Sequence, residues 1–389
     1  MPLPLLALFF AAFGIGTGEF VIAGLLPDVS ASLGVSIPDA GYLVTFYALG
    51  IAIGGPLMSV GIARLDRKLA LLLLVGILTI GQAVCALAPG FIALLIVRVV
   101  IAFAHGAFFG VAAIVATRLV PPEKRGSAVA LLLAGITVAN ILGVPAGTAI
   151  GNAFGWRATF WAVGAVTLLA WIGVLVFVPR AEGGAAKAAD LRAEWRVLGR
   201  QAVFMTLALI IVAMIGQFSL FTYIAPLLIS VTGVPEDVVP WLLLLFGIGS
   251  TLGVLLGGRL ADWKLMPALA GTLLASAIIY AGLGLFIHNP IATGIGIFLW
   301  GGVSFAFGAP AQTRILRWTG DAPNLASPLV PAAFNIGVAL GATIGSLALD
   351  RGMSYAALPW IGAVVSLLAL GITLASWAME KGTAEPILP

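Results

Sequence analysis

The sequence predicts an all-α membrane protein of twelve transmembrane helices in two pseudo-symmetric halves of six helices each. Three observations lead to this prediction. Of the 389 residues, 61% are hydrophobic and only 9% are charged, whereas soluble domains carry about 25% charged residues. Apolar runs of about 20 residues, each long enough to span a bilayer as a helix, recur along the whole chain. Short glycine-containing patterns also repeat at constant spacing.

Twelve apolar runs can be placed along the chain. They cover residues 3–27, 40–63, 69–89, 91–117, 127–151, 158–179, 202–230, 238–258, 265–287, 291–313, 326–349 and 355–378. The first run has no basic segment before it and is too long for a signal peptide, so we expect a spanning helix. The longest polar segment, residues 180–200, predicts a cytoplasmic linker with a short surface helix at residues 190–198. It separates an N-terminal half, residues 1–179, from a C-terminal half, residues 201–389.

Positive charge between the runs falls on one side of the predicted membrane. When successive connections alternate between the two sides, one side receives nearly all of the lysines and arginines. The other side receives only two basic residues and several acidic ones: Arg157, Arg351, Asp28, Asp39, Glu236, Asp237 and Asp350. The positive-inside rule therefore predicts a multi-pass protein of the plasma (inner) membrane with both termini in the cytoplasm.

The two halves share patterns at matching positions. Three residues near the end of the fifth run recur 194 positions later: Gly147, Gly151 and Arg157 match Gly341, Gly345 and Arg351. Two glycines of the second run recur 199 positions later, since Gly50 and Gly54 match Gly249 and Gly253. Two related six-helix halves are typical of secondary transporters, which bind substrate between repeats.

The loop after the eighth run reads Gly258-Arg-Leu-Ala-Asp262-Trp-Lys264. It resembles the major facilitator signature, Gly-x-x-x-Asp-Arg/Lys-x-Gly-Arg/Lys-Arg/Lys. The resemblance implies a cytoplasmic gate in which the aspartate pairs with basic groups. The first half departs from the pattern, because Ser59 and Ala63 replace the glycine and aspartate. Its basic part remains as Arg64, Arg67 and Lys68, which ordinary positive-inside charge explains equally well.

Two further helices resemble signatures of the same superfamily. The run at residues 91–117 carries Arg98 at the position of a signature arginine. The run at residues 127–151 resembles the antiporter motif, a series of glycines around Gly-Pro, here with one residue inserted: Gly143, Pro145, Gly147 and Gly151. Glycines every four residues form a flat face for close helix contact, and proline bends a helix. Both features suit a moving interface, and simple tight packing explains them as well.

Other segments narrow the resemblance to one branch. They are Gly18-Glu19-Phe20, Gly24-Leu-Leu-Pro27, His105-Gly-Ala-Phe-Phe-Gly110, Gly155-Trp-Arg-Ala-Thr-Phe160 and Phe334-Asn335-Ile-Gly337. Together they resemble the twelve-helix drug:proton antiporters, and most of all the arabinose and chloramphenicol efflux permeases. The resemblance implies a monomeric exporter of a small organic molecule, driven by the proton gradient without a cofactor.

Glu19 is the only acidic residue well inside a predicted span, and Arg98 needs a partner because a charge at hydrocarbon depth is costly. Counted from the outer ends of their helices, the two residues lie at nearly equal depth, about 12 and 10 Å. We infer that they are neighbours, and that Glu19 binds a proton when the site opens outward and releases it inward in exchange for substrate. His105, two turns after Arg98 on about the same face, extends the path or binds substrate. A structural ion pair and a packed histidine are the competing interpretations.

Polar and aromatic residues in other runs are candidates for the substrate cavity. They are Phe20, Tyr47, Asn140, Gln217, Phe221, Tyr223, Gln312 and Asn335. An amide in hydrocarbon needs a partner, so these side chains are expected to face protein or cavity. Hydrogen bonding between helices is the alternative for each.

Other functions lack the residues that they require. No Gly-Lys pair occurs, so there is no phosphate-binding loop for an ATP-driven pump. One cysteine, Cys85, and two histidines offer no metal cluster or nucleophilic site, so an enzyme is not expected. Nucleic-acid binding has no support, because the basic residues follow the topology. A membrane receptor that transports nothing is also less favoured, because that function does not require two related six-helix halves. A proton-coupled importer or a passive facilitator of a sugar or metabolite remains the alternative to an exporter.

Overall fold

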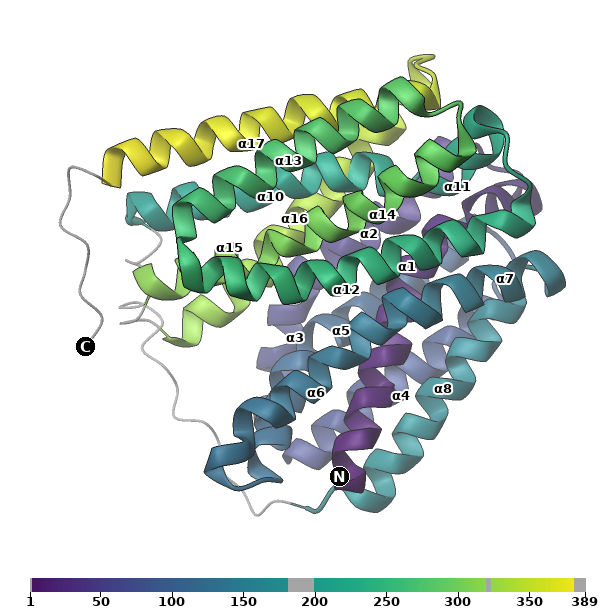
Figure 1. Cartoon of the computed structure of the whole chain (residues 1–389). Coiled ribbons are helices and arrows are strands. Elements are labelled where there is room, and N and C mark those ends of the chain that lie inside the picture. The colour runs from purple at the N-terminus through teal and green to yellow at the C-terminus, as the bar shows by residue number, and fades with distance from the viewer. Residues whose placement is uncertain (1, 181–198, 320–322, 381–389) are drawn as a thin grey trace. The chain divides into compact units, whose positions relative to one another are not determined.

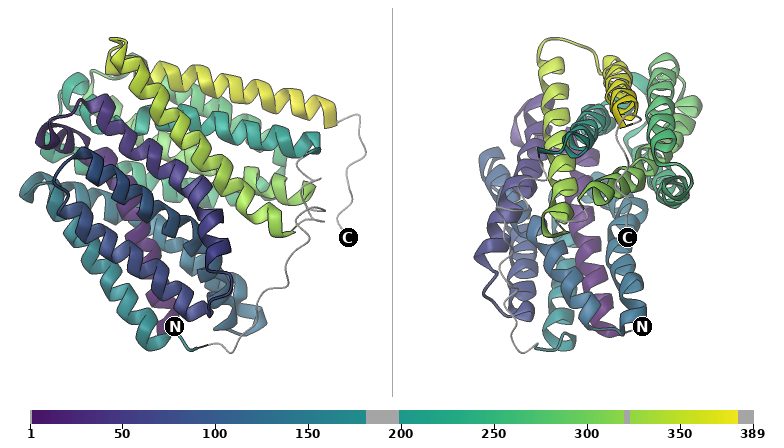
Figure 2. Two further views of the ribbon diagram at one scale, coloured as in Figure 1. Left: turned by 180° about the vertical axis from the view of Figure 1, so that it is seen from behind. Right: turned by 90° about the vertical axis from the view of Figure 1, so that its left-hand side faces the viewer.

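A computed structural model describes residues 2–180, 199–319 and 323–380, with only the helical backbone described for residues 323–328. Figures 1 and 2 show helices throughout this part of the chain. Most of the predicted linker and the predicted surface helix at residues 190–198 lie outside it.

Twelve helical segments of the described chain are long and apolar enough to cross a bilayer, as the sequence predicts. The first six comprise α1 (Leu3–Leu33); α2 (Ile37–Leu49), η1 (Gly50–Gly54) and α3 (Gly55–Gly61); α4 (Arg67–Ala86); α5 (Phe91–Arg118); η2 (Pro122–Lys124), α6 (Arg125–Val138), η3 (Ala139–Gly143) and α7 (Val144–Phe154); and α8 (Trp156–Phe177). The second six comprise α10 (Gln201–Phe221), followed by α11 (Ile224–Leu227) and η5 (Leu228–Thr232); η6 (Glu236–Val238) and α12 (Val239–Trp263); α13 (Leu265–Phe286); α14 (Pro290–Ala306) and α15 (Gly308–Trp318); α16 (Pro323–Asp350); and η7 (Tyr355–Ala357) and α17 (Leu358–Glu380).

The helices form two compact units. The first contains the described part of Met1–Ala186 together with Pro235–Leu244, and the second contains the described parts of Lys187–Val234 and Leu245–Pro389. The short segment Pro235–Leu244, which precedes and begins α12, joins the first unit. There, Asn152 Nδ2 of α7 donates a hydrogen bond to the Glu236 carbonyl oxygen at 2.8 Å.

Glycines repeat the same helix contact in both units. In the first unit, an added Cβ at Gly147 or Gly151 of α7 would meet Val21 or Leu25 of α1 at 2.7 or 2.2 Å. In the second unit, Gly341 and Gly345 of α16 approach α10. Their nearest neighbours there include Ile215 and Ser219, the residues 194 positions after Val21 and Leu25. The repeat seen in the sequence is therefore a repeat of helix packing.

The second repeated glycine pair also marks a close crossing. Gly50 and Gly54 lie against α5, where an added Cβ would come within 2.7 Å of Ala102 or 2.1 Å of the Phe103 ring. Gly249 and Gly253 of α12 lie against α14 instead. There the nearest atoms belong to the backbone, which moves less readily than a side chain.

Gly253→Ala is expected to destabilise the second unit by roughly 1–3 kcal/mol, the usual cost of overpacking. The new Cβ would lie 2.0 Å from the Gly302 carbonyl oxygen, so the two helices must move apart. Thermal unfolding in detergent measures the effect. Gly271→Ala on α13 is the control, because no atom lies within 4 Å of its added Cβ. Equal melting temperatures for both variants would contradict the prediction.

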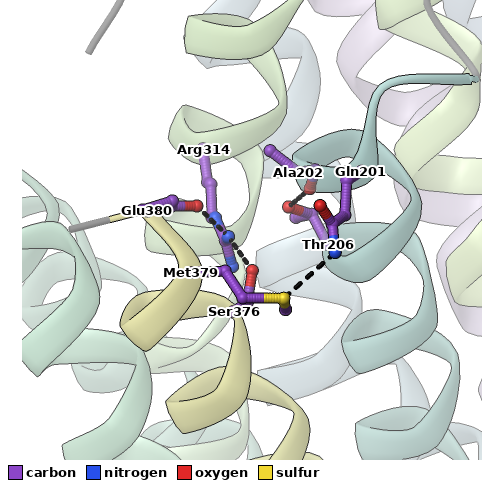
Figure 3. Close-up of polar contacts among 7 residues, drawn as sticks. All are labelled: Gln201, Ala202, Thr206, Arg314, Ser376, Met379 and Glu380. Carbon is purple, nitrogen blue, oxygen red and sulfur yellow. Dashed lines mark hydrogen bonds and ion pairs between the residues drawn. The ribbon is translucent and has the colours of Figure 1, made fainter. Parts of the chain in front are cut away.

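A buried arginine joins the ends of α15 and α17 in the second unit, and a neighbouring bond adds the start of α10 (Figure 3). Arg314 of α15, whose side chain is 1% exposed, pairs with Glu380 of α17. Its Nη2 also donates to Ser376 Oγ at 2.5 Å. Beside this pair, Gln201 Nε2 at the start of α10 donates to Met379 Sδ at 3.0 Å. These bonds hold the ends of α10, α15 and α17 together.

Glu380→Leu is expected to destabilise the protein by about 3 kcal/mol, because it leaves a buried guanidinium without its counter-ion. The double variant with Arg314→Met is expected to recover much of that loss, since it removes the unpaired charge as well. A double-mutant cycle of melting temperatures in detergent measures this coupling. Additive effects of the two substitutions would show that the pair contributes no stability of its own.

Candidate functional site

The interior of the first unit holds a buried arginine. Arg98 lies on α5, and 1% of its surface is exposed. Its Nη1 donates to the Gly18 carbonyl oxygen of α1 at 3.1 Å, and its Nε donates to the Leu43 carbonyl oxygen of α2 at 3.4 Å. The guanidinium carbon lies 4.6 Å from the centre of the Tyr47 ring, a cation–π contact. Its Nη2 has no hydrogen-bond partner among the described residues, so the N–H groups of this nitrogen on a buried cation stay free.

Glu19 lies beside this arginine without pairing with it. It directly follows Gly18, whose carbonyl oxygen binds Arg98, and its side chain is half-buried. The two charges interact electrostatically, but the described side chains form no direct ion pair. A carboxyl group that is close to a cation and still partly exposed can gain or lose a proton without first breaking a salt bridge.

The first helix ends later than the sequence predicts, so the predicted depth of Glu19 is wrong. The sequence predicts that the first span ends at residue 27, whereas α1 continues through Pro27 to Leu33 and ends at Gly34, whose φ of 64° suits glycine. Glu19 therefore lies about 21 Å along α1 from its end rather than about 12 Å. It still neighbours Arg98, because α1 extends further in that direction than the start of α5.

Tyr47 connects Arg98 to His105. The Tyr47 hydroxyl and His105 Nδ1 are hydrogen-bonded at 3.2 Å, and both residues are buried. The His105 ring also contacts Phe109, with 5.6 Å between ring centres. Tyr47 therefore contacts the Arg98 cation on one side and His105 on the other. This arrangement also suits the packed, hydrogen-bonded histidine that the sequence allowed.

Gln82 of α4 is a neighbour of the site that the sequence analysis missed. Its side chain is 3% exposed, and Oε1 has no hydrogen-bond partner. Its Nε2 would lie 2.8 Å from a Cβ added at Gly18, the residue whose carbonyl oxygen binds Arg98. A single glutamine in an apolar run is a weak signal, although a buried amide always needs a partner. Cys85, one turn later, is buried as expected.

The antiporter-like motif forms a wide helical turn before its proline. The segment η3 is π-helical, and the Val144 N–H bonds to the Ala139 carbonyl oxygen five residues earlier. Asn140 lies in this turn and is buried. An added Cβ at Gly143 would lie 2.0 Å from Thr17 of α1, so the motif's glycine face packs on α1. This contact fits tight packing, and a role in movement stays a prediction.

The predicted cavity residues of the second unit have different environments. Tyr223 is fully buried and donates its hydroxyl to the Ala342 carbonyl oxygen at 3.0 Å, a bond between helices. Phe221 packs in an aromatic cluster with Phe246 and Trp300. Asn335 Nδ2 bonds to its own helix, and its Oδ1 has no partner.

Three candidates remain. Gln217 lines a pocket of the second unit. Gln312 and Phe20 are half-buried.

The predicted gate residues lie at helix ends. Asp262 and Lys264 are exposed around the end of α12, and Asp262 makes no ion pair within the described chain. Gly258 has no atom within 4 Å of an added Cβ. In the first unit, Arg64 is exposed, while Arg67 and Lys68 begin α4 and are half-buried.

Asp66 has a structural role that the sequence analysis missed. Its Oδ1 accepts backbone N–H bonds from Lys68 and Leu69 at 3.0 and 3.2 Å and so caps α4. No group of three His, Cys, Asp or Glu side chains that could hold a metal ion occurs among the described residues.

A family model described as the Major Facilitator Superfamily matches residues 8–319, most of the chain. The chain belongs to the major facilitator superfamily. The inner membrane transport protein YdhP of Escherichia coli (strain K12) is 38% identical over 380 residues, which cover 98% of this chain and 97% of YdhP. The chloramphenicol resistance protein of Streptomyces lividans is 36% identical over 374 residues, which cover 95% of each.

A solved structure shares the fold. It is that of a bacterial homolog to the human lysosomal transporter Spinster, in an inward-facing and occupied conformation, with a TM-score of 0.76 and 18% identity. The alignment covers 99% of this chain and 98% of that one. As a major facilitator superfamily member, the protein is therefore a secondary transporter of a small molecule, embedded in the inner membrane by multiple spans.

Proposed function

We propose that the protein exports a small organic molecule by alternating access in exchange for protons, and that Glu19 is the residue that carries the proton. One observation supports the proposal most strongly. Glu19 stands unpaired beside Arg98, and the Arg98 guanidinium keeps a free N–H at Nη2. When Glu19 is ionised, its carboxylate can move towards the N–H groups of Arg98 Nη2 and be stabilised by them. When Glu19 is protonated, this attraction is lost.

The proposed cycle uses this difference. Glu19 binds a proton from the outer side, which removes its attraction to Arg98. It releases the proton to the inner side, and the carboxylate then approaches Arg98 Nη2. Substrate binds after the proton has left and is carried outward in the return step. Arg98 stays fixed by its bonds to Gly18 and Leu43, so only the carboxyl group changes charge. The Tyr47 ring lies against the guanidinium and bonds to His105, and His105 is a secondary candidate for the proton path.

The rest of the proposal follows the topology and the relatives. Both termini are assigned to the cytoplasm by the positive-inside rule. The protein works as a monomer and needs no cofactor, because the proton gradient supplies the energy. Export is favoured over import by the name of the Streptomyces lividans relative, a chloramphenicol resistance protein.

Transport by purified protein in vesicles tests the proposal. A panel of drugs, sugars and metabolites is offered with and without an imposed pH gradient, and internal pH is followed with a dye. Antiport predicts that substrate accumulates against its gradient only when protons flow the opposite way. Flow of both in the same direction would identify an importer, and gradient-independent movement of every compound would identify a facilitator.

A further inference from the structure

The second unit contains a pocket between α10, α14, α15 and α16. Its wall includes Met214 and Gln217 of α10, Ser304 and Phe305 of α14, and Phe334 of α16. The pocket reaches the point where α14 gives way to α15, at Phe307, which also lines it. The described helices of one unit therefore form its wall.

Gln217 supplies the pocket's uncommitted polar group. The residue is 4% exposed, and its amide makes no hydrogen bond to another described residue. Ser304, the other polar side chain of the wall, interacts with the Tyr280 hydroxyl, which accepts a hydrogen bond from Trp300 Nε1 at 2.8 Å. A buried amide without a partner is unfavourable unless water or a ligand binds it.

The remainder of the wall is apolar and aromatic. Phe305, Phe307 and Phe334 contribute rings, and Met214 contributes a thioether that packs well against aromatic groups. Among the residues that the structure describes, no charged side chain lines the pocket. A charged ligand group would lose its hydration there without gaining a counter-ion, so its binding would be unfavourable. A sugar has more hydroxyl groups than the pocket has hydrogen-bond partners, so some hydroxyls would be buried without a bond.

We propose that this pocket binds the substrate through an uncharged, largely apolar group, such as an aryl ring, with one polar atom bonded to the Gln217 amide. Sugars are therefore not substrates of this site. The assignment rests on the proposed transport function, for which it names the substrate class. It makes Gln217 the residue that orients the ligand and the phenylalanines the residues that select its shape.

Binding to the purified full-length protein tests this assignment. Tritiated chloramphenicol and two further uncharged aryl amides serve as probes, and unlabelled arabinose and xylose serve as competitors. At least one probe is expected to bind, with no displacement by either sugar in hundredfold excess. Gln217→Met keeps the side-chain length and removes the amide, so it is expected to weaken probe binding roughly threefold to tenfold, the effect of one hydrogen bond.

Two variants control for folding and position. Gln201→Met makes the same change at the start of the same helix. It removes the contact with Met379 but leaves the pocket wall intact, so the probes are expected to bind as they do to the unaltered protein. Phe334→Leu shortens the wall and is expected to weaken binding of the aryl probes; because Phe334 also packs against Phe218, binding is compared at a temperature at which both proteins remain folded. Displacement by sugars, no binding by any probe, or equal binding by Gln217→Met and Gln201→Met would overturn the assignment.

The vesicle assay separates this failure from failure of the transport proposal. Proton-coupled export of sugars alone would overturn the substrate class and leave the antiporter function standing. Absence of proton-coupled movement for every compound would overturn the function itself.

Discussion

Glu19→Gln is expected to exchange substrate across vesicle membranes while moving no protons. The glutamine keeps the size and hydrogen-bonding ability of a protonated glutamate but cannot release a proton. Substrate accumulation driven by a pH gradient should fall at least about a hundredfold, because coupling requires a group that changes charge between the two sides. Exchange of labelled for unlabelled substrate, which needs no net proton movement, should persist. Both quantities can be measured in the same vesicles.

Asp237→Asn is the matched control for this substitution. Asp237 is an exposed acidic residue before α12, and its neutralisation should leave both quantities unchanged. If Glu19→Gln moves protons with normal stoichiometry, Glu19 is not the coupling residue, and its position beside Arg98 serves the fold alone.

Arg98→Lys is expected to lower gradient-driven export by about tenfold or more, although the charge is retained. The guanidinium bonds to carbonyl oxygens on α1 and α2 and lies over the Tyr47 ring. A single ammonium group cannot reproduce this planar arrangement. Each hydrogen bond from a charged donor contributes about 1.5–3 kcal/mol, so the loss of one should also lower the melting temperature. Transport in vesicles and unfolding in detergent measure the two effects.

Arg125→Lys controls for the loss of an arginine as such, because Arg125 is exposed at the start of α6. Normal export by Arg98→Lys would show that a positive charge alone suffices at this position. Lower stability with normal export in the refolded fraction would show that Arg98 is a structural residue.

The sequence predicted the spanning helices well, because a long apolar run has few alternatives in a bilayer. It failed at the end of α1, where Pro27 and Asp28 indicate an end that the structure does not have. Proline removes one backbone donor, and a long helix tolerates this loss. The polar segment after residue 27 therefore continues as helix rather than loop.

The surroundings of the charged residues were harder to predict. Hydropathy indicated that Arg98 faces protein, but its hydrogen-bond acceptors are the backbone oxygens of Gly18 and Leu43. Every residue has a backbone oxygen, so the sequence does not indicate which ones bind the arginine. Gln82 was missed because nothing local separates it from an ordinary polar residue in an apolar run. The pocket at Gln217 depends on four helices meeting, so no single segment of sequence contains it.

The wide turn at η3 explains how the chain tolerates an extra residue in its antiporter-like motif. An inserted residue normally rotates everything beyond it by about 100° around the helix axis, which would turn Gly147 and Gly151 away from α1. A π-turn takes up one residue locally, and both glycines still meet α1 beyond it. The wide turn thus keeps the glycine face on α1 in a segment whose sequence has one residue more than the motif it resembles.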